Sequence, residues 1–513
     1  MAGRGMRQCL RDITVYLVLV LAIATLGSLQ YGFHLAELNA PQDVITCRKK
    51  SISTVDRITK WVTSSRPQPA AGFLPDCIPM NEAAFATVSS IFTLGGLAGA
   101  LCAGPFSSRR GRLPAMRATA LFYVVGAAVE TIAGSVWLMA LGRLVSGFGA
   151  GASTVIVPLY ISEISPPNER GLFGAMTQVS INVGILGTQT LGYFLSYGNA
   201  WRWILGVGVC AAALQAVGLL AVPESPAWLA AHADATKAQR TLQRIRGKGF
   251  DIQDEVAAWN RDPSASSSAE EEGLLAQPDG VAPPSPTSPG FKKPVHLGFV
   301  QVVKDPLCRP AIVAVVGIMF AQQLCGINSI IMYSVSLLAD LLPTSSALLT
   351  ILISVVNLVM TIACAPLPDR LGRKACLLLS IVGQGTSSLA LALSIVFGVK
   401  ILSAISVLFF VAFFAVGLGP VPFILASELV GQEAVGATQS WCLGANYVAT
   451  FLVAQFFPII NTALNKALGG QGWVYFVFAV LAAGSAVFVS SKVPETLGKK
   501  DVDDVWGRTR RLD

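Results

Sequence analysis

The side chains with the clearest chemical potential are amides that interrupt an apolar stretch. Gln322, Gln323 and Asn328 lie within the apolar run 310–335, where a buried amide needs hydrogen-bond partners. Neighbouring side chains on a helix point about 100° apart, so Gln322 and Gln323 cannot both face one packed seam, and this favours a cavity. Neutral amides suit a polyol, because they offer donors and acceptors to hydroxyl groups and carry no charge to be desolvated. The alternative is that the amides only join helices.

Comparable side chains occur in three other apolar runs, and we expect them to line the same cavity. An amide held in lipid without partners would be costly. These residues are Gln178, with Ile181 and Ile185 following on its helical face at i+3 and i+7, Asn357 and Asn446.

A second set of residues is ionisable, and we expect it near the cytoplasmic ends of apolar runs. Charges in a membrane persist only where they are paired, so we expect ion-pair clusters that join helix ends. Such clusters would form a cytoplasmic gate that separates when this side opens; the alternative is that they only set the topology. The set comprises Arg109, Arg112, Arg143, Glu163, Arg170, Glu224, Asp369, Arg370, Arg373, Glu428 and Glu495.

His34 and Glu37 lie three residues apart in the first apolar run, hence on one helical face. Each is expensive to hold in hydrocarbon unless it is paired or faces water. One hypothesis is that they share a proton and make the activity of the protein depend on pH, since histidine titrates near neutral pH. The alternative is a polar pair that reaches out to the membrane surface.

Cys47 and Cys77 are the only cysteines in the first loop, which we place outside the cytoplasm. Disulfides persist there, so we predict that the two pair; the alternative is two free thiols. The other cysteines show no metal-ligand spacing, and the three histidines are far apart in sequence. We therefore expect no metal, no cofactor and no enzymatic activity.

The elements that position these residues follow from composition. Apolar residues make up 53% of the 513-residue chain and charged residues 13%, with a mean hydropathy of +0.61, so lipid is its main solvent. The net charge of +8 resides in short basic clusters between apolar runs, which indicates cytoplasmic loops and cytoplasmic termini, not nucleic-acid binding. Twelve runs can each cross a bilayer: 13–36, 84–106, 116–137, 138–161, 171–195, 202–222, 310–335, 346–368, 375–397, 401–427, 437–460 and 472–491.

The twelve runs fall into two sets of six with matching landmarks. Glu163 and Glu428 are 265 positions apart, and the basic loops 108–112 and 369–373 are 261 apart, which indicates an internal repeat. We predict an all-α membrane protein with two pseudo-symmetric six-helix bundles that rock about a central site. Its parts would be an N-terminal bundle (1–222), a cytoplasmic linker (223–309) with short helices and a disordered Ser/Pro-rich middle, a C-terminal bundle (310–491) and a cytoplasmic tail (492–513).

The linker contains Leu274 and Leu275 after three glutamates, a pattern typical of an acidic dileucine sorting signal. A sorting adaptor is the partner that would bind it. This motif favours a vacuolar or endolysosomal membrane over the plasma membrane.

Short motifs recur in order along most of the chain. They include GSLQYGF (27–33), NAPQ (39–42), VPLYISEISP (157–166), PESP (223–226), QQLCGIN (322–328), DRLGRK (369–374), GLGPVPF (417–423) and PET (494–496). In these motifs the chain resembles the sugar porters of the major facilitator superfamily, and it is similar to facilitative hexose transporters.

The resemblance implies facilitative uniport of a monosaccharide by a monomer, with the amides and isoleucines above contacting the sugar. It also implies that Phe423 lies against the sugar ring and that Tyr333 closes the outer side. His34 stands where proton-coupled members carry aspartate and facilitators carry asparagine, so proton-coupled symport or antiport is an alternative. A non-transporting sugar sensor is a third hypothesis, which the short tail disfavours.

Overall fold

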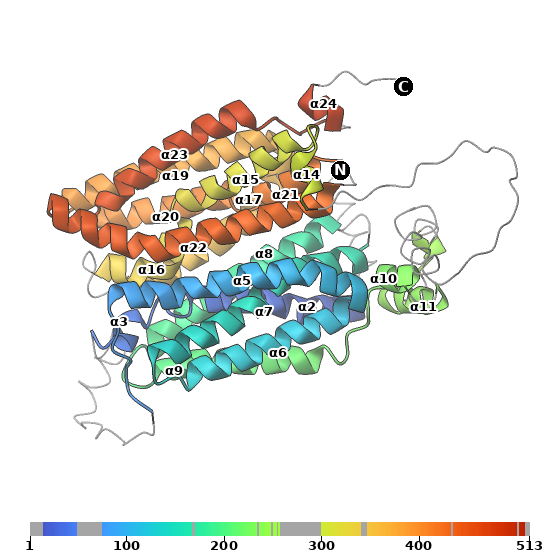
Figure 1. Ribbon diagram of the computed structural model, residues 1–513, viewed down its shortest axis with the longest axis horizontal. Coiled ribbons are helices and arrows are strands. Elements are labelled where there is room, and N and C mark those ends of the chain that lie inside the picture. Colours follow the sequence, from blue (N-terminus) through green and yellow to red (C-terminus); the bar gives the residue numbers. More distant parts are fainter. Residues whose placement is uncertain are drawn as a thin grey trace, which may run out of the picture.

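The computed structural model describes residues 14–48, 74–166, 170–232, 235–247, 250–253, 255–256, 299–339, 346–431, 434–499 and 502–507. Every regular element in these ranges is a helix (Figure 1). The dileucine at Leu274 and Leu275 lies outside the described residues.

The N-terminal portion contributes six long helices that pack mainly on one another, with α5 and α6 against α7, and α8 against α2. We call this group the N half. Its members are α2 (Val15–Ala36), α5 (Glu82–Arg110), α6 (Arg112–Thr131), α7 (Val136–Ile164), α8 (Arg170–Leu195) and α9 (Trp201–Gly218).

The C-terminal portion, the C half, contributes six further spans, two of which are broken. One break follows α15 at Gly326, whose φ of 98° suits glycine, and the other lies between Gly417 and Pro420. The spans are α15 (Arg309–Leu324) with α16 (Ile327–Ala339), α17 (Ser346–Cys364), α19 (Arg373–Val396), α20 (Lys400–Val416) with α21 (Val421–Glu428), α22 (Val435–Leu468) and α23 (Trp473–Lys492).

Ten spans are long and apolar enough to cross a membrane, and α8 and the shorter apolar helix within α17 complete the twelve. The twelve-span, all-helical fold expected from hydropathy is therefore confirmed.

The short helices mark the two ends of the molecule. The helix α3 (Gln42–Ile45) lies at one end, whereas α10 (Pro226–His232), α11 (Ala235–Arg246) and α24 (Val502–Trp506) lie at the other (Figure 1). We call these the disulfide end and the linker end. At the linker end are also α14 (Gln301–Lys304) and α18 (Leu367–Leu371).

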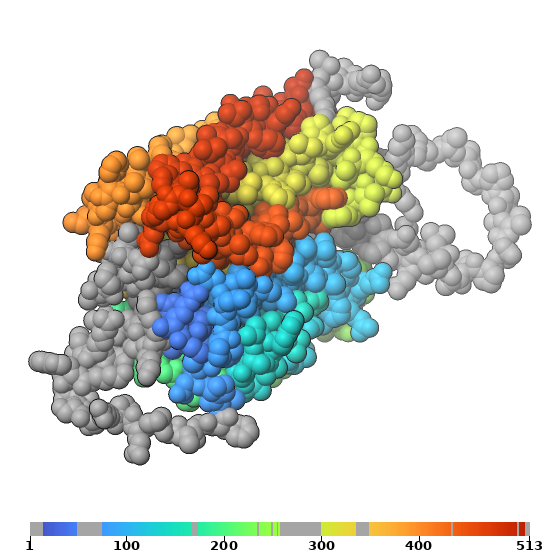
Figure 2. All heavy atoms as spheres, turned by 60° about the vertical axis from the view of Figure 1, so that its left-hand side comes forward, coloured from blue at the N-terminus to red at the C-terminus, as the bar shows by residue number. Residues whose placement is uncertain are grey.

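The two halves lie side by side (Figure 2). The helix α5 packs against α22, and α8 packs against α17. One buried apolar cluster near the disulfide end contains residues of both halves, among them Phe85 and Tyr333. Toward the linker end, each half has a buried cluster of its own. Among the described residues, the buried apolar cluster shared by both halves therefore lies at the disulfide end.

The disulfide predicted from the sequence is present: Cys47 and Cys77 are bonded, with their Cα atoms 5.3 Å apart. The bond closes a loop of 30 residues between the end of α2 and the start of α5. It therefore ties together the segments that lead into these two helices at the disulfide end.

Replacing Cys47 by serine should lower the stability of the disulfide end by about 3–4 kcal/mol, because the open loop regains chain entropy. Thermal unfolding of Cys47→Ser and Cys77→Ser should show equal losses, and the double variant no further loss. Cys102→Ser, which removes an exposed free thiol, is the matched control. Additive losses in the double variant would contradict the bond.

Candidate functional site

The amides of the sequence prediction meet beside the first broken span. Nδ2 of Asn328 donates to Oε1 of Gln323 over 2.6 Å, and Nε2 of Gln323 donates to Oε1 of Gln322 over 3.1 Å. From α22, Nδ2 of Asn446 donates to the same Gln322 oxygen over 2.6 Å. The four buried amides thus form one connected network.

The network reaches the second broken span through Gln322, whose Nε2 donates to the carbonyl of Leu418. Leu418 lies between α20 and α21, where Gly417 and Pro420 interrupt the helix. Interrupted helices inside membranes supply backbone groups for a polar site. Both breaks therefore contribute to one polar region.

Two oxygens of this network remain open to a ligand. Among the described residues, Oδ1 of Asn328 and Oδ1 of Asn446 accept no hydrogen bond, although each has two lone pairs. These acceptors could receive hydroxyl groups of a neutral polyol.

A second group of polar side chains joins the two halves. On α8, Nδ2 of Asn182 donates to Oγ1 of Thr361 on α17 over 2.8 Å. Longer contacts of 3.4 Å link Asn182 to Gln178 and to Asn357. Sequence reasoning missed Asn182, although its place four residues after Gln178 put it on the same helical face.

The remaining predicted contact residues lie on the same elements. On α8, Ile185 is buried and Ile181 half-buried. Tyr333 is buried, donates to a carbonyl of α22 over 2.8 Å, and has its ring centroid 6.3 Å from that of Phe85 in the N half. Phe423 on α21 is 37% exposed.

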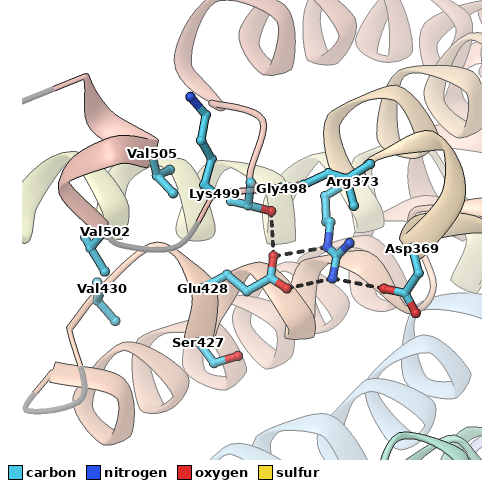
Figure 3. Close-up of a pocket in the computed structure, with 11 residues that line it drawn as sticks. Asp369, Arg373, Ser427, Glu428, Val430, Gly498, Lys499, Val502 and Val505 are labelled. Atoms are coloured by element: carbon cyan, nitrogen blue, oxygen red, sulfur yellow. Dashed lines mark hydrogen bonds and ion pairs between the residues drawn. The ribbon is translucent and has the colours of Figure 1, made fainter.

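At the linker end of the C half, Arg373 is the centre of an ion-pair cluster (Figure 3). Its Nη2 lies 2.8 Å from Oε1 of Glu428 and 3.0 Å from Oδ1 of the exposed Asp369. Glu495 accepts the backbone N–H groups of Arg373 and Lys374 over 2.9 and 3.0 Å. The cluster borders a pocket of about 450 Å³, which is lined by residues other than the amides.

The N half repeats this arrangement. Nη2 of Arg112 lies 2.6 Å from Oε1 of Glu163, and Glu224 accepts the backbone N–H groups of Arg112 and Leu113 over 2.9 and 3.2 Å. Each of these clusters joins helices within one half, and the described ion pairs at the linker end do not cross between halves.

The two matching glutamates differ electrostatically. Burial raises the pKa of Glu224 above its usual value, although the N–H groups of Ser225, Leu113 and Arg112 oppose the shift. Burial also acts to raise the pKa of Glu495, but four backbone N–H donors together hold it below its usual value.

Arg143 does not belong to the linker-end gate, which corrects the prediction. It precedes Glu163 by 20 residues on the same helix, or about 30 Å at ~1.5 Å per residue, and bonds to Glu37 near the disulfide end. Arg143 lies in the first turns of α7 and Glu163 in its last turn, so the two residues lie at opposite ends of this helix. Arg109 and Arg370 are exposed and form no ion pair among the described residues. The Arg170 side chain lies outside the described part.

His34 and Glu37 are bonded to each other and fully buried, so neither reaches the membrane surface. Beside them lies Glu130, also fully buried, which sequence reasoning missed. A lone acidic residue inside the run 116–137 was the available signal.

Comparisons with known proteins agree with this geometry. The profile of the family described as "Sugar (and other) transporter" matches residues 20–502. A probable metabolite transport protein of Saccharomyces cerevisiae is 34% identical, covering 99% of this chain and 98% of its own. The vacuolar protein sorting-associated protein 73 of the same yeast is 30% identical, covering 96% of each chain.

A facilitated glucose transporter (member 3) of Rattus norvegicus is 29% identical, with 95% of this chain and 92% of the relative covered. Among solved structures, the proton:xylose symporter XylE superimposes with a TM-score of 0.69 at 22% identity, covering 96% of this chain and 99% of that chain. At that identity the likeness supports the shared fold alone.

Proposed function

Because the chain belongs to the sugar (and other) transporter family, we propose that it carries a monosaccharide of the hexose class across its membrane by facilitative uniport. The observation that carries this proposal is the network of neutral amides around Gln322, with its open acceptors on Asn328 and Asn446. Such groups bind hydroxyls reversibly, because a neutral site pays little to release a neutral solute. The protein is a membrane transporter and not an enzyme.

In this proposal the bundles 1–222 and 310–491 move as two bodies joined by the linker 223–309, and the linker end faces the cytoplasm. The apolar cluster shared by both halves and Tyr333 close the outer side, while Gln178, Ile181, Ile185, Gln323, Asn357, Asn446 and Phe423 surround the sugar with Gln322 and Asn328. The N-half and C-half clusters tie helix ends together while the cytoplasmic side is closed and separate when it opens.

The two charged side chains of a linker-end ion pair should stabilise the protein together by a measurable coupling energy. Arg112 and Glu163 are mostly buried and joined by three charge-assisted hydrogen bonds, so a double-mutant cycle on Arg112→Gln and Glu163→Gln should give about 1–3 kcal/mol. Unfolding and uptake should be measured together. Arg109→Gln is the control, since this arginine is exposed and forms no ion pair with any residue that the structure describes. A coupling energy near zero would contradict a role for this pair.

Uptake of a labelled sugar panel by purified protein in liposomes tests the function. We expect saturable hexose transport that collapses the sugar gradient in either direction. Equal uptake of all sugars, or none above empty liposomes, would contradict the proposal.

Proton-coupled sugar transport is the second candidate, favoured by the buried cluster around Glu37. Repeating the uptake with an imposed pH gradient decides between the candidates, because only a coupled porter accumulates sugar against its gradient.

For location we propose a vacuolar or endolysosomal membrane. The support is the acidic dileucine at Leu274 and Leu275, together with the relationship to a yeast protein whose name refers to vacuolar sorting. A sorting adaptor would be the partner, and the transporter itself would act as a monomer.

A further inference from the structure

One side-chain oxygen of the N half receives an amide donor of the proposed sugar site from each half. Oδ1 of Asn182 on α8 accepts from Nε2 of Gln178, one turn earlier on the same helix, over 3.4 Å. The same oxygen accepts from Nδ2 of Asn357 on α17, also over 3.4 Å. Among the residues that the structure describes, neither donor has another hydrogen-bond acceptor.

The nitrogen of the same amide is held more firmly. Nδ2 of Asn182 donates to Oγ1 of Thr361 on α17 over 2.8 Å, an ordinary hydrogen-bond length, whereas contacts of 3.4 Å are long and weak. Thr361 lies one turn after Asn357, nearer the linker end of α17. The bond to Thr361 therefore sets the rotation of the Asn182 amide, and with it the position of Oδ1.

Close packing of α8 on α2 fixes the backbone on both sides of Asn182. A side chain in place of Gly32 on α2 would collide with the carbonyl oxygen of Ile181. A side chain in place of Gly184 on α8 would likewise collide with the carbonyl oxygen of Leu29. Asn182 therefore moves with the N half, whereas its partners on α17 move with the C half.

The two donors need an acceptor throughout a transport cycle. Asn182 and Asn357 are buried, and a buried amide N–H group without a partner is costly. In the proposed site, hydroxyl oxygens of the sugar accept from Gln178 and Asn357 while the sugar is bound. Another acceptor is required when the site closes without sugar, and Asn182 is placed to provide it.

We propose that Asn182 is a surrogate acceptor, which takes the place of sugar hydroxyl groups while the carrier returns empty. The proposal rests on the proposed uniport of a hexose, and it adds a positioning residue for one step of that cycle. When sugar binds, Gln178 and Asn357 exchange the Asn182 oxygen for hydroxyl oxygens, and Asn182 keeps its bond to Thr361. When sugar leaves, both donors turn back to Asn182.

The step that depends on Asn182 is closure of the halves over a site without sugar. In net transport, a uniporter must make this closure once per cycle, because the empty carrier has to face the first side again. Closure removes Gln178 and Asn357 from water. With Asn182 their donors remain paired, whereas without it two amide donors would be left without an acceptor.

The length of the two contacts suits this role. An acceptor that held the donors tightly would compete with the sugar, whereas a contact of 3.4 Å is given up at little cost. The amide is also neutral, so the exchange moves no charge within the site. Binding of the sugar is therefore hardly opposed by the surrogate.

Two other roles for Asn182 predict different results. If it contacts the sugar directly, its loss should weaken sugar binding. If it only joins α8 to α17, its loss should lower stability and slow every mode of transport alike. A surrogate acceptor alone predicts a selective effect on the return of the empty carrier.

Two transport measurements on Asn182→Leu in liposomes test the proposal. Leucine has nearly the shape of asparagine but cannot hydrogen-bond. Exchange of labelled glucose at equal concentrations on both sides needs no empty return, whereas net uptake into sugar-free liposomes does. We expect net uptake to fall about tenfold and exchange to change less than about twofold. If glucose is not transported, the hexose of the panel with the fastest uptake replaces it.

Thr190→Val is the matched control on the same helix. It removes a hydroxyl that donates over 2.7 Å to the carbonyl of Leu186, within α8 itself, and it should leave the ratio of exchange to net uptake unchanged. Asn182→Leu should bind sugar at least as tightly as the unchanged protein, because only the site without sugar loses hydrogen bonds. A clearly weaker affinity, or an unchanged ratio, would overturn the surrogate role.

If Asn182→Leu fails to fold, Thr361→Val provides the test. It releases the amide nitrogen and lets Oδ1 turn away, so the ratio of exchange to net uptake should rise, although by less. An unchanged ratio would again overturn the proposal. Absence of hexose transport by the unchanged protein would contradict the proposed function, whereas hexose transport with normal ratios in both variants would contradict the surrogate role alone.

Discussion

Replacing Gln322 by alanine should weaken sugar binding by about 1–3 kcal/mol, or roughly five- to 150-fold in Kd. Gln322 is the hub of the amide network, since its oxygen accepts from Gln323 and Asn446 and its Nε2 reaches Leu418. In the proposed site, its loss would remove a contact to the sugar and also leave the remaining amides without their shared partner. Calorimetric or fluorescence titration with the transported sugar measures the effect.

Stability must be measured beside affinity, because the same hydrogen bonds also join helices. Gln384→Ala is the matched control: this glutamine is buried in α19, and neither of its side-chain polar atoms has a partner among the described residues. We expect it to leave sugar affinity unchanged. A Gln322→Ala protein with reduced stability and normal affinity would show that the amides only hold helices together.

Replacing Arg143 by methionine should destabilise the protein by about 3–5 kcal/mol, the usual cost of leaving a buried charge without its partner. Arg143 is fully buried, and a single nitrogen holds both Glu37 and the carbonyl of His34. Methionine fills similar volume, so the loss reports the charge and the hydrogen bonds. Thermal unfolding in a fixed detergent gives the measurement.

A second substitution separates charge from packing. Adding Glu37→Gln to Arg143→Met removes the orphaned carboxylate and should recover a large part of the lost stability. The Arg143→Lys protein should be less stable than the unchanged protein, since a lysine ammonium lacks the planar fork of hydrogen-bond donors that arginine offers. An additive loss in the double variant would mean that Arg143 acts through packing alone.

Hydropathy predicted the twelve spans well because a bilayer imposes one simple condition on every segment that crosses it. The apolar stretch must be about 20 residues long and helical, so the run 138–161 corresponds to α7 and the run 437–460 lies within α22. The breaks after α15 and α20 were not foreseen, because a break changes backbone hydrogen bonding without changing hydropathy.

The amides were foreseen as a group because a polar side chain in an apolar run needs an explanation wherever it occurs. Which amides touch was not foreseen. Gln323 and Asn328 meet because the turn at Gly326 brings the start of α16 back toward α15, and sequence spacing alone does not contain that turn.

By itself, the sequence determined that this protein resides in a lipid bilayer, how many spans it has, that Cys47 pairs with Cys77 and which residue types form its polar sites. These depend on composition and on short separations along the chain. Only the tertiary structure decided that Arg143 pairs with Glu37, that Glu130 joins them, and that the ion pairs at the linker end stay within each half. Those pairings depend on the direction and rotation of helices packed side by side, which are set by contacts between residues distant in the chain.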